Sequence, residues 1–123
     1  MNDLEIYIDG ASKGNPGPSG IGVVICHGPQ AIENISVYIG VTTNNVAEYT
    51  ALIYALQGAA KLKARVLKIN TDSQLLYKQV IREYKIKSPN ISSLYEQALA
   101  LMAGFKEVSI RQIPREENKG ADK

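Results

Sequence analysis

The chain has 123 residues, of which 45% are hydrophobic and 21% charged, with a net charge of +2, a composition typical of one soluble globular domain. It contains no apolar run long enough to span a membrane, and its first residues lack the bases and apolar stretch of a secretory signal. One cysteine and one histidine exclude an internal disulfide and a zinc site of four Cys and His ligands. We therefore expect a cytoplasmic protein without a membrane partner.

The amino-terminal part of the chain predicts three strands in series. Residues 4–9 alternate apolar with polar or amphipathic side chains, a period of two that predicts a strand ending near Asp9. A long glycine-rich loop, residues 10–20, is expected to follow this strand. Residues 21–26 and 31–38 are rich in β-branched side chains and are joined by a short turn, which predicts an antiparallel hairpin in the same sheet.

A helix is predicted next, over residues 46–62, where apolar side chains recur at helical spacing. Asn45, with Glu48 three residues later, fits an N-cap and a capping box at the start of this helix. The remaining patterns predict, in order, a strand at 66–71, helices at 73–84 and 91–103, a strand at 108–113 and the start of a helix at 115–123.

This order of elements predicts an α/β fold, in which a mixed five-stranded sheet of three antiparallel strands and then parallel strands is flanked by helices. The connection through the helix at 46–62 is expected to be a right-handed crossover, which places the strand at 66–71 parallel to the first strand. Ligands of such sheets bind beyond the carboxyl ends of the strands.

Four carboxylates are expected to lie near the carboxyl ends of the strands. Asp9 and Asp72 each end a predicted strand, Glu48 lies in the first turn of the intervening helix, and Asp122 follows the last strand. Four carboxylates that converge would repel one another and shift one another's pKa values, so a hard divalent cation such as Mg²⁺ or Mn²⁺ is their natural partner. The spacing also fits a plainer interpretation, in which the aspartates are turn residues and Glu48 only caps its helix.

Five short motifs extend this pattern over the whole chain. They are, in order, DGAS at 9–12, GNPGP at 14–18, TTNNVAE at 42–48, TDSQ at 71–74 and REENKGAD at 115–122. In this order and spacing they resemble the type 1 ribonucleases H. The resemblance implies a single ribonuclease H-like domain over residues 1–123. The resemblance also leads us to expect a truncated final helix, because the family continues this helix for several turns beyond the position of Asp122.

The resemblance also implies a reaction, the endonucleolytic hydrolysis of the RNA strand of RNA/DNA hybrids to give 5′-phosphate and 3′-hydroxyl ends. Two Mg²⁺ ions per site, for which Mn²⁺ can substitute, would be held by the four catalytic residues Asp9, Glu48, Asp72 and Asp122. Asp9 would bridge both ions.

To recognise a hybrid, a protein must contact 2′-hydroxyls on one strand and deoxyribose on the other through the minor groove. The family resemblance assigns substrate binding to Gly10, Gly14, Asn15, Thr43, Asn44, Asn45 and Gln74. The asparagines and the glutamine match positions that contact sugars or base edges, and Thr43 matches a contact to a DNA phosphate. The glycines would let the backbone approach the ligand closely. A local role as a cap or turn residue also fits several of them.

Two features of many relatives are missing here. Residues 110–117 contain no histidine, and Arg115 is the residue that could partly replace it. Residues 85–90 contain no basic, tryptophan-bearing protrusion, although bases outnumber acids thirteen to seven over residues 61–123. Affinity for the hybrid would then be lower, or would depend on four basic residues, Lys78, Arg82, Lys85 and Lys87. These residues fit a plain solvated surface equally well.

Three other functions stay open on the sequence alone. A binding module would hold a hybrid or duplex without cutting it, although binding alone needs none of the four acids. A nuclease with the same chemistry could act on double-stranded RNA or branched DNA, since the protrusion is missing. A Mg²⁺-dependent phosphatase for small molecules is disfavoured by the Thr43-Asn44-Asn45 motif.

Overall fold

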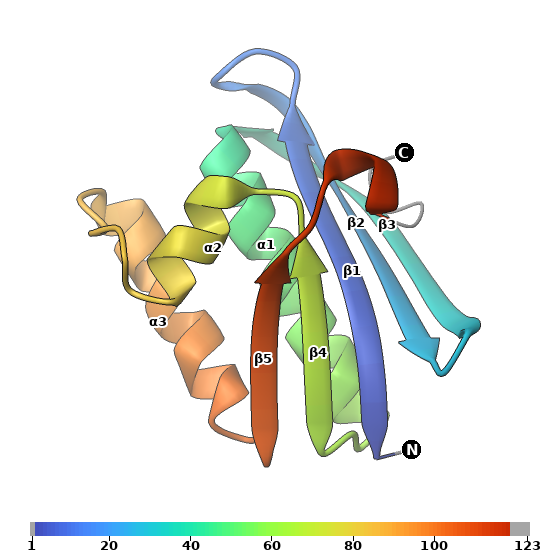
Figure 1. Cartoon of the computed structure of the whole chain (residues 1–123). Helices are drawn as coiled ribbons and strands as arrows, with labels where there is room; N and C mark the ends of the chain where they lie inside the picture. Colours follow the sequence, from blue (N-terminus) through green and yellow to red (C-terminus); the bar gives the residue numbers. More distant parts are fainter. Residues whose placement is uncertain (1, 119–123) are drawn as a thin grey trace.

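A computed structural model describes residues 2–118 (Figure 1). Over these residues the strands are, in chain order, β1 (Asp3–Ser12), β2 (Gly17–His27), β3 (Gln30–Thr42), β4 (Val66–Thr71) and β5 (Glu107–Gln112). They form one sheet in the spatial order β3-β2-β1-β4-β5. The first three strands pair antiparallel, whereas β4 pairs parallel with both β1 and β5. This arrangement confirms the predicted mixed sheet.

Three helices, α1 (Asn44–Lys61), α2 (Gln74–Val80) and α3 (Pro89–Met102), lie on one side of the sheet in Figure 1. Helix α1 packs on β1 and β2, and α3 packs on α1. The core lies between α1 and the sheet, where Ile6 and Ile8 from β1 are fully buried beside Leu52 and Leu56 from α1. None of the helices in the described part of the chain is both long and apolar enough to cross a membrane.

Strand β1 is longer than the alternation of side chains predicts. It continues past Asp9 because Ala11 pairs with Gly20 and Ser12 with Ser19, so a hairpin takes up most of the predicted loop. Small residues carry no apolar alternation, and the sequence pattern therefore misses their pairing. Asp9 is thus inside a strand rather than at its end.

The start of α1 also differs from the prediction. The N-cap is Thr43, whose Oγ1 accepts a hydrogen bond from the backbone N–H of Val46 at 3.3 Å, and Asn45 lies inside the helix. Glu48 does not close a capping box, because its carboxylate accepts from the backbone N–H of Gly10 in β1. Threonine and asparagine are both good N-caps, which is why the local pattern placed the cap two residues too late.

The carboxyl-terminal elements follow the predicted order with different ends. Helix α2 ends at Val80 instead of residue 84, and Arg82 then adopts a left-handed backbone with φ of 67°. After β5, the predicted helix start is represented by a single 3-10 turn, η1 (Arg115–Glu117). The end of that predicted helix, residues 119–123, lies outside the described residues.

Candidate active site

Three of the four predicted carboxylates converge. Asp9 of β1, Glu48 of α1 and Asp72 just after β4 each place one carboxylate oxygen within 4.8 Å of the others. The parallel pairing of β1 with β4 ends at Ile8 and Thr71, so the next residue of each chain segment lies at the same edge. Asp122 lies outside the described residues.

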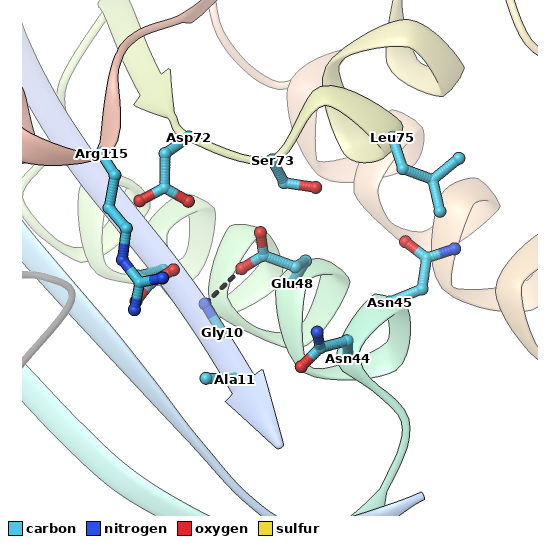
Figure 2. Close-up of a pocket in the computed structure, with 10 residues that line it drawn as sticks. Gly10, Ala11, Asn44, Asn45, Glu48, Asp72, Ser73, Leu75 and Arg115 are labelled. Carbon is cyan, nitrogen blue, oxygen red and sulfur yellow. Dashed lines mark hydrogen bonds between the residues drawn. The ribbon is translucent and has the colours of Figure 1, made fainter. Parts of the chain in front are cut away.

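The carboxylates line a cavity of about 310 Å³ together with Asn44 and Asn45. Figure 2 shows Asp72 and Glu48 on facing sides of this cavity, and the two asparagines on the α1 side. Three carboxylate oxygens in close reach of one another are the donor set that Mg²⁺ and Mn²⁺ prefer. The residues present therefore fit a divalent cation.

Glu48 is the most buried of the three acids, with 7% of its surface exposed. Burial, followed by the negative charge of Asp9, raises its pKa from 4.5 to about 8, although the hydrogen bond from Gly10 acts in the opposite direction. In the metal-free protein at neutral pH, the Glu48 carboxyl group is therefore mainly protonated. A bound cation favours its ionised form and would release that proton.

Glu48 reaches β1 because α1 approaches this strand at Gly10. A Cβ atom on Gly10 would collide with the backbone of Ala47 and lie 2.5 Å from the backbone nitrogen of Glu48. The segment that comes close to the Gly10 backbone in the structure is therefore α1, and not a ligand as the sequence predicted.

We expect Gly10→Ala to lower the free energy of unfolding by about 3 kcal/mol, because backbone rather than a flexible side chain must move. Gly20→Ala is the matched control, since its Cβ would meet only the Val37 carbonyl oxygen, at 3.5 Å. Urea unfolding of both variants and the wild type measures the difference. Equal stability of the two variants would contradict the close packing of α1 on β1.

Asn118 is a site residue for which the sequence predicts no role, although it lies in the last motif. It is 3% exposed, and its Nδ2 donates to the Ile8 carbonyl oxygen and to Asp72 Oδ2, both at 3.0 Å. It thus ties the segment after η1 to β1 and to one of the acids. These contacts join residues 110 and 46 positions apart, which no local pattern reports.

The predicted substrate-binding residues near α1 form a connected group. The Ser12 backbone N–H donates to Asn44 Oδ1 at 2.7 Å, and the Asn44 backbone N–H donates to Asn15 Oδ1 at 3.0 Å. These bonds fix the β1–β2 hairpin to the start of α1, where Thr43 is the N-cap. The hairpin connection includes Gly14, whose φ of 90° favours glycine.

Gln74 and Arg115, two residues singled out in the sequence, differ in their position relative to the cavity that holds the acids. Gln74 is the first residue of α2 and is exposed, and it does not line the cavity that holds the acids. Arg115, in η1, does line that cavity, and Figure 2 shows its side chain on the same side as Asp72. The structure therefore brings Arg115 to the acids and leaves Gln74 at their periphery.

Comparisons with known proteins agree with this geometry. A family model described as reverse transcriptase-like matches residues 7–123. Ribonuclease HI of Halobacterium salinarum is 40% identical over 97% of this chain and 60% of its own length. The solved N-terminal RNase H domain of Rv2228c from Mycobacterium tuberculosis is 38% identical with a TM-score of 0.94, over 98% of this chain and 93% of that one. LC11-RNase H1, solved in complex with an RNA/DNA hybrid, is 37% identical with a TM-score of 0.91, over 97% and 91% of the two chains.

The chain spans only part of these curated relatives, namely 33% of the bifunctional protein Rv2228c and 60% of the Halobacterium enzyme. The likeness nevertheless covers almost all of this chain, since the family model matches residues 7–123 and the solved RNase H domain covers 98% of it. On these grounds the chain belongs to the ribonuclease H family of type 1.

Proposed function

We propose that this protein is a metal-dependent endoribonuclease that hydrolyses the RNA strand of RNA/DNA hybrids. The observation that carries the proposal is the convergence of Asp9, Glu48 and Asp72 within 4.8 Å at one edge of the sheet. The hybrid-bound structure of LC11-RNase H1, which shares this fold, supports the choice of substrate. The family match over residues 7–123 supports assigning residues 1–123 to one ribonuclease H-like domain.

The three acids would hold Mg²⁺, with Mn²⁺ as a substitute, and Asp122 is proposed as a fourth ligand. Bound there, two such ions would supply activation of a water for in-line attack and stabilisation of the leaving 3′-oxygen, and the reaction would give 5′-phosphate and 3′-hydroxyl ends. The chain itself holds the carboxylates in place. Asp9 is fixed within β1, Glu48 accepts from the Gly10 N–H, and Asp72 accepts from Asn118.

The hybrid would lie across the start of α1, beside the acids. Asn15, Asn44, Asn45 and Gln74 are proposed to contact its minor groove, Thr43 a DNA phosphate, and Gly14 to allow close backbone approach to the hybrid. The space beside Gly10, predicted from the sequence to admit the hybrid, is taken by α1, so Gly10 is proposed to act by letting α1 and Glu48 approach β1. The hydrogen bonds from Ser12 to Asn44 and from Asn44 to Asn15 support this assignment, because they hold polar groups in fixed positions before a ligand arrives.

A binding module remains the second candidate, because the same surface could hold a hybrid without cutting it. The carboxylate cluster favours hydrolysis, since acids gathered near a phosphate backbone weaken binding unless a cation neutralises them. Turnover therefore separates the two functions.

We expect end-labelled RNA/DNA hybrid to be cut in its RNA strand with Mg²⁺ or Mn²⁺ and left intact with EDTA. Double-stranded RNA and double-stranded DNA are the comparison substrates, and a label on the hybrid's DNA strand is the internal control. Hybrid that is bound but uncut would identify a binding module, and equal cutting of double-stranded RNA would identify a different nuclease specificity.

A further inference from the structure

We infer that Gln79 is a positioning residue that fixes the side chain of Asn45 beside the acids and so strengthens recognition of the hybrid. This assignment rests on the proposed function, because it treats Asn45 as a substrate contact. Asn45 lines the cavity that holds the carboxylates, whereas Gln79 does not and acts through Asn45.

Gln79 lies near the end of α2 and faces α1. Its Oε1 accepts a hydrogen bond from the Tyr49 hydroxyl at 3.0 Å and another from Asn45 Nδ2 at 3.4 Å. Asn45 and Tyr49 are four residues apart, so they lie on the same face of α1. One glutamine oxygen therefore joins two consecutive turns of α1 to α2.

Burial makes Gln79 a rigid partner. Only 7% of its surface is exposed, and Tyr49 is fully buried. A buried carboxamide must keep its hydrogen bonds to offset its desolvation, which restricts its rotamers. The hydrogen bond from the Tyr49 hydroxyl therefore fixes the position of Gln79 Oε1, and the same oxygen accepts the hydrogen bond from Asn45 Nδ2.

Asn45 depends on that fixed point. Its backbone is set by α1, and its Oδ1 is buried with no hydrogen-bond partner within the described part of the chain. The bond from Nδ2 to Gln79 is therefore what orients the carboxamide. Without it no side-chain hydrogen bond within the described residues would fix the rotamer of the carboxamide, and binding a hybrid would have to order it.

Gln79→Met tests this role, because methionine keeps the length of the side chain and removes its hydrogen-bonding atoms. We expect KM for the hybrid to rise roughly three- to tenfold, the range for ordering one polar side chain on binding. We expect kcat to stay unchanged, because the acids keep their own contacts. Gln57→Met, on the exposed side of α1, is the matched control and should leave both constants unchanged.

A double-mutant cycle separates positioning from a general loss of structure. Asn45→Ala should itself raise KM, and adding Gln79→Met in that background should change KM less than twofold. An equal rise in both backgrounds, no rise in either, or an unchanged KM in Asn45→Ala would overturn the inference.

Stability is controlled separately, because Gln79→Met leaves the buried Tyr49 hydroxyl without its partner. If that variant unfolds, Tyr49→Phe combined with Gln79→Met removes both ends of the bond and should show the same rise in KM. Wild-type protein that cuts no hybrid would refute the proposed function. Wild-type protein that cuts, with Gln79→Met kinetically unchanged, would refute only the role of Gln79.

Discussion

Asp9→Asn is expected to slow hybrid cleavage by at least about a thousandfold, equivalent to roughly 4 kcal/mol of lost transition-state stabilisation. The substitution keeps the size of the side chain and removes its charge. Asp9 stands in β1 at the point where the parallel pairing with β4 ends, so the sheet fixes its position in the cluster. Hybrid binding should stay intact or become tighter, because one negative charge near the phosphates is lost.

Single-turnover cleavage in saturating Mg²⁺ measures the first effect, and fluorescence anisotropy of a labelled hybrid in EDTA measures the second. Asp3→Asn is the matched control, an exposed aspartate at the start of the same strand. Cleavage at the wild-type rate by Asp9→Asn would remove Asp9 from the catalytic residues. Loss of binding together with cleavage would point instead to a damaged fold.

Glu48→Gln is expected to abolish cleavage and yet to stabilise the metal-free protein at pH 8.5, by on the order of 3 kcal/mol. Burial, and then Asp9, raises the pKa of Glu48 from 4.5 to about 8, so the folded chain binds this proton more tightly than the unfolded chain does. The associated stability is complete below about pH 4.5 and is lost as the pH rises to about 8. Glutamine stays neutral throughout and keeps an oxygen that accepts from the Gly10 N–H.

Urea unfolding in EDTA at several values between pH 4.5 and 8.5 tests this expectation. The difference between Glu48→Gln and the wild type isolates the one carboxyl group, because the other groups titrate in both proteins. This difference should grow with pH. Mg²⁺ added at pH 8.5 should raise the free energy of unfolding of the wild type more than that of the variant. A difference that does not change with pH would contradict the raised pKa.

Local patterns were sufficient for much of the fold. Alternation predicted the strand core of β1, and helical spacing predicted α1, because both depend on neighbours in sequence. The meeting of Asp9 and Asp72 also followed, since the crossover through α1 forces β1 and β4 to run parallel. These parts of the site depend on chain topology and need no knowledge of side-chain contacts.

Contacts between distant elements could not be predicted in this way. Glu48 fits a capping box in the sequence, but its carboxylate accepts a hydrogen bond from the Gly10 N–H, 38 residues earlier. This contact forms because Gly10 has no side chain to keep α1 away from β1. Gln79 and Tyr49 meet across 30 residues at a helix contact, where each satisfies the other's buried polar group. Tertiary packing decides such pairs, and it overrides local propensity.

The position of Asn118 bears on how the protein is made. Its side chain contacts the carbonyl oxygen of Ile8, 110 residues earlier, and the carboxylate of Asp72. During translation the β1–β2–β3 meander and α1 emerge first, and the segment that carries Asn118 leaves the ribosome after every strand of the sheet. A growing chain therefore holds its acids incompletely fixed until synthesis has passed this residue. Ordering of the acids at this sheet edge is therefore coupled to synthesis of the segment that carries Asn118, which follows all five strands of the described sheet.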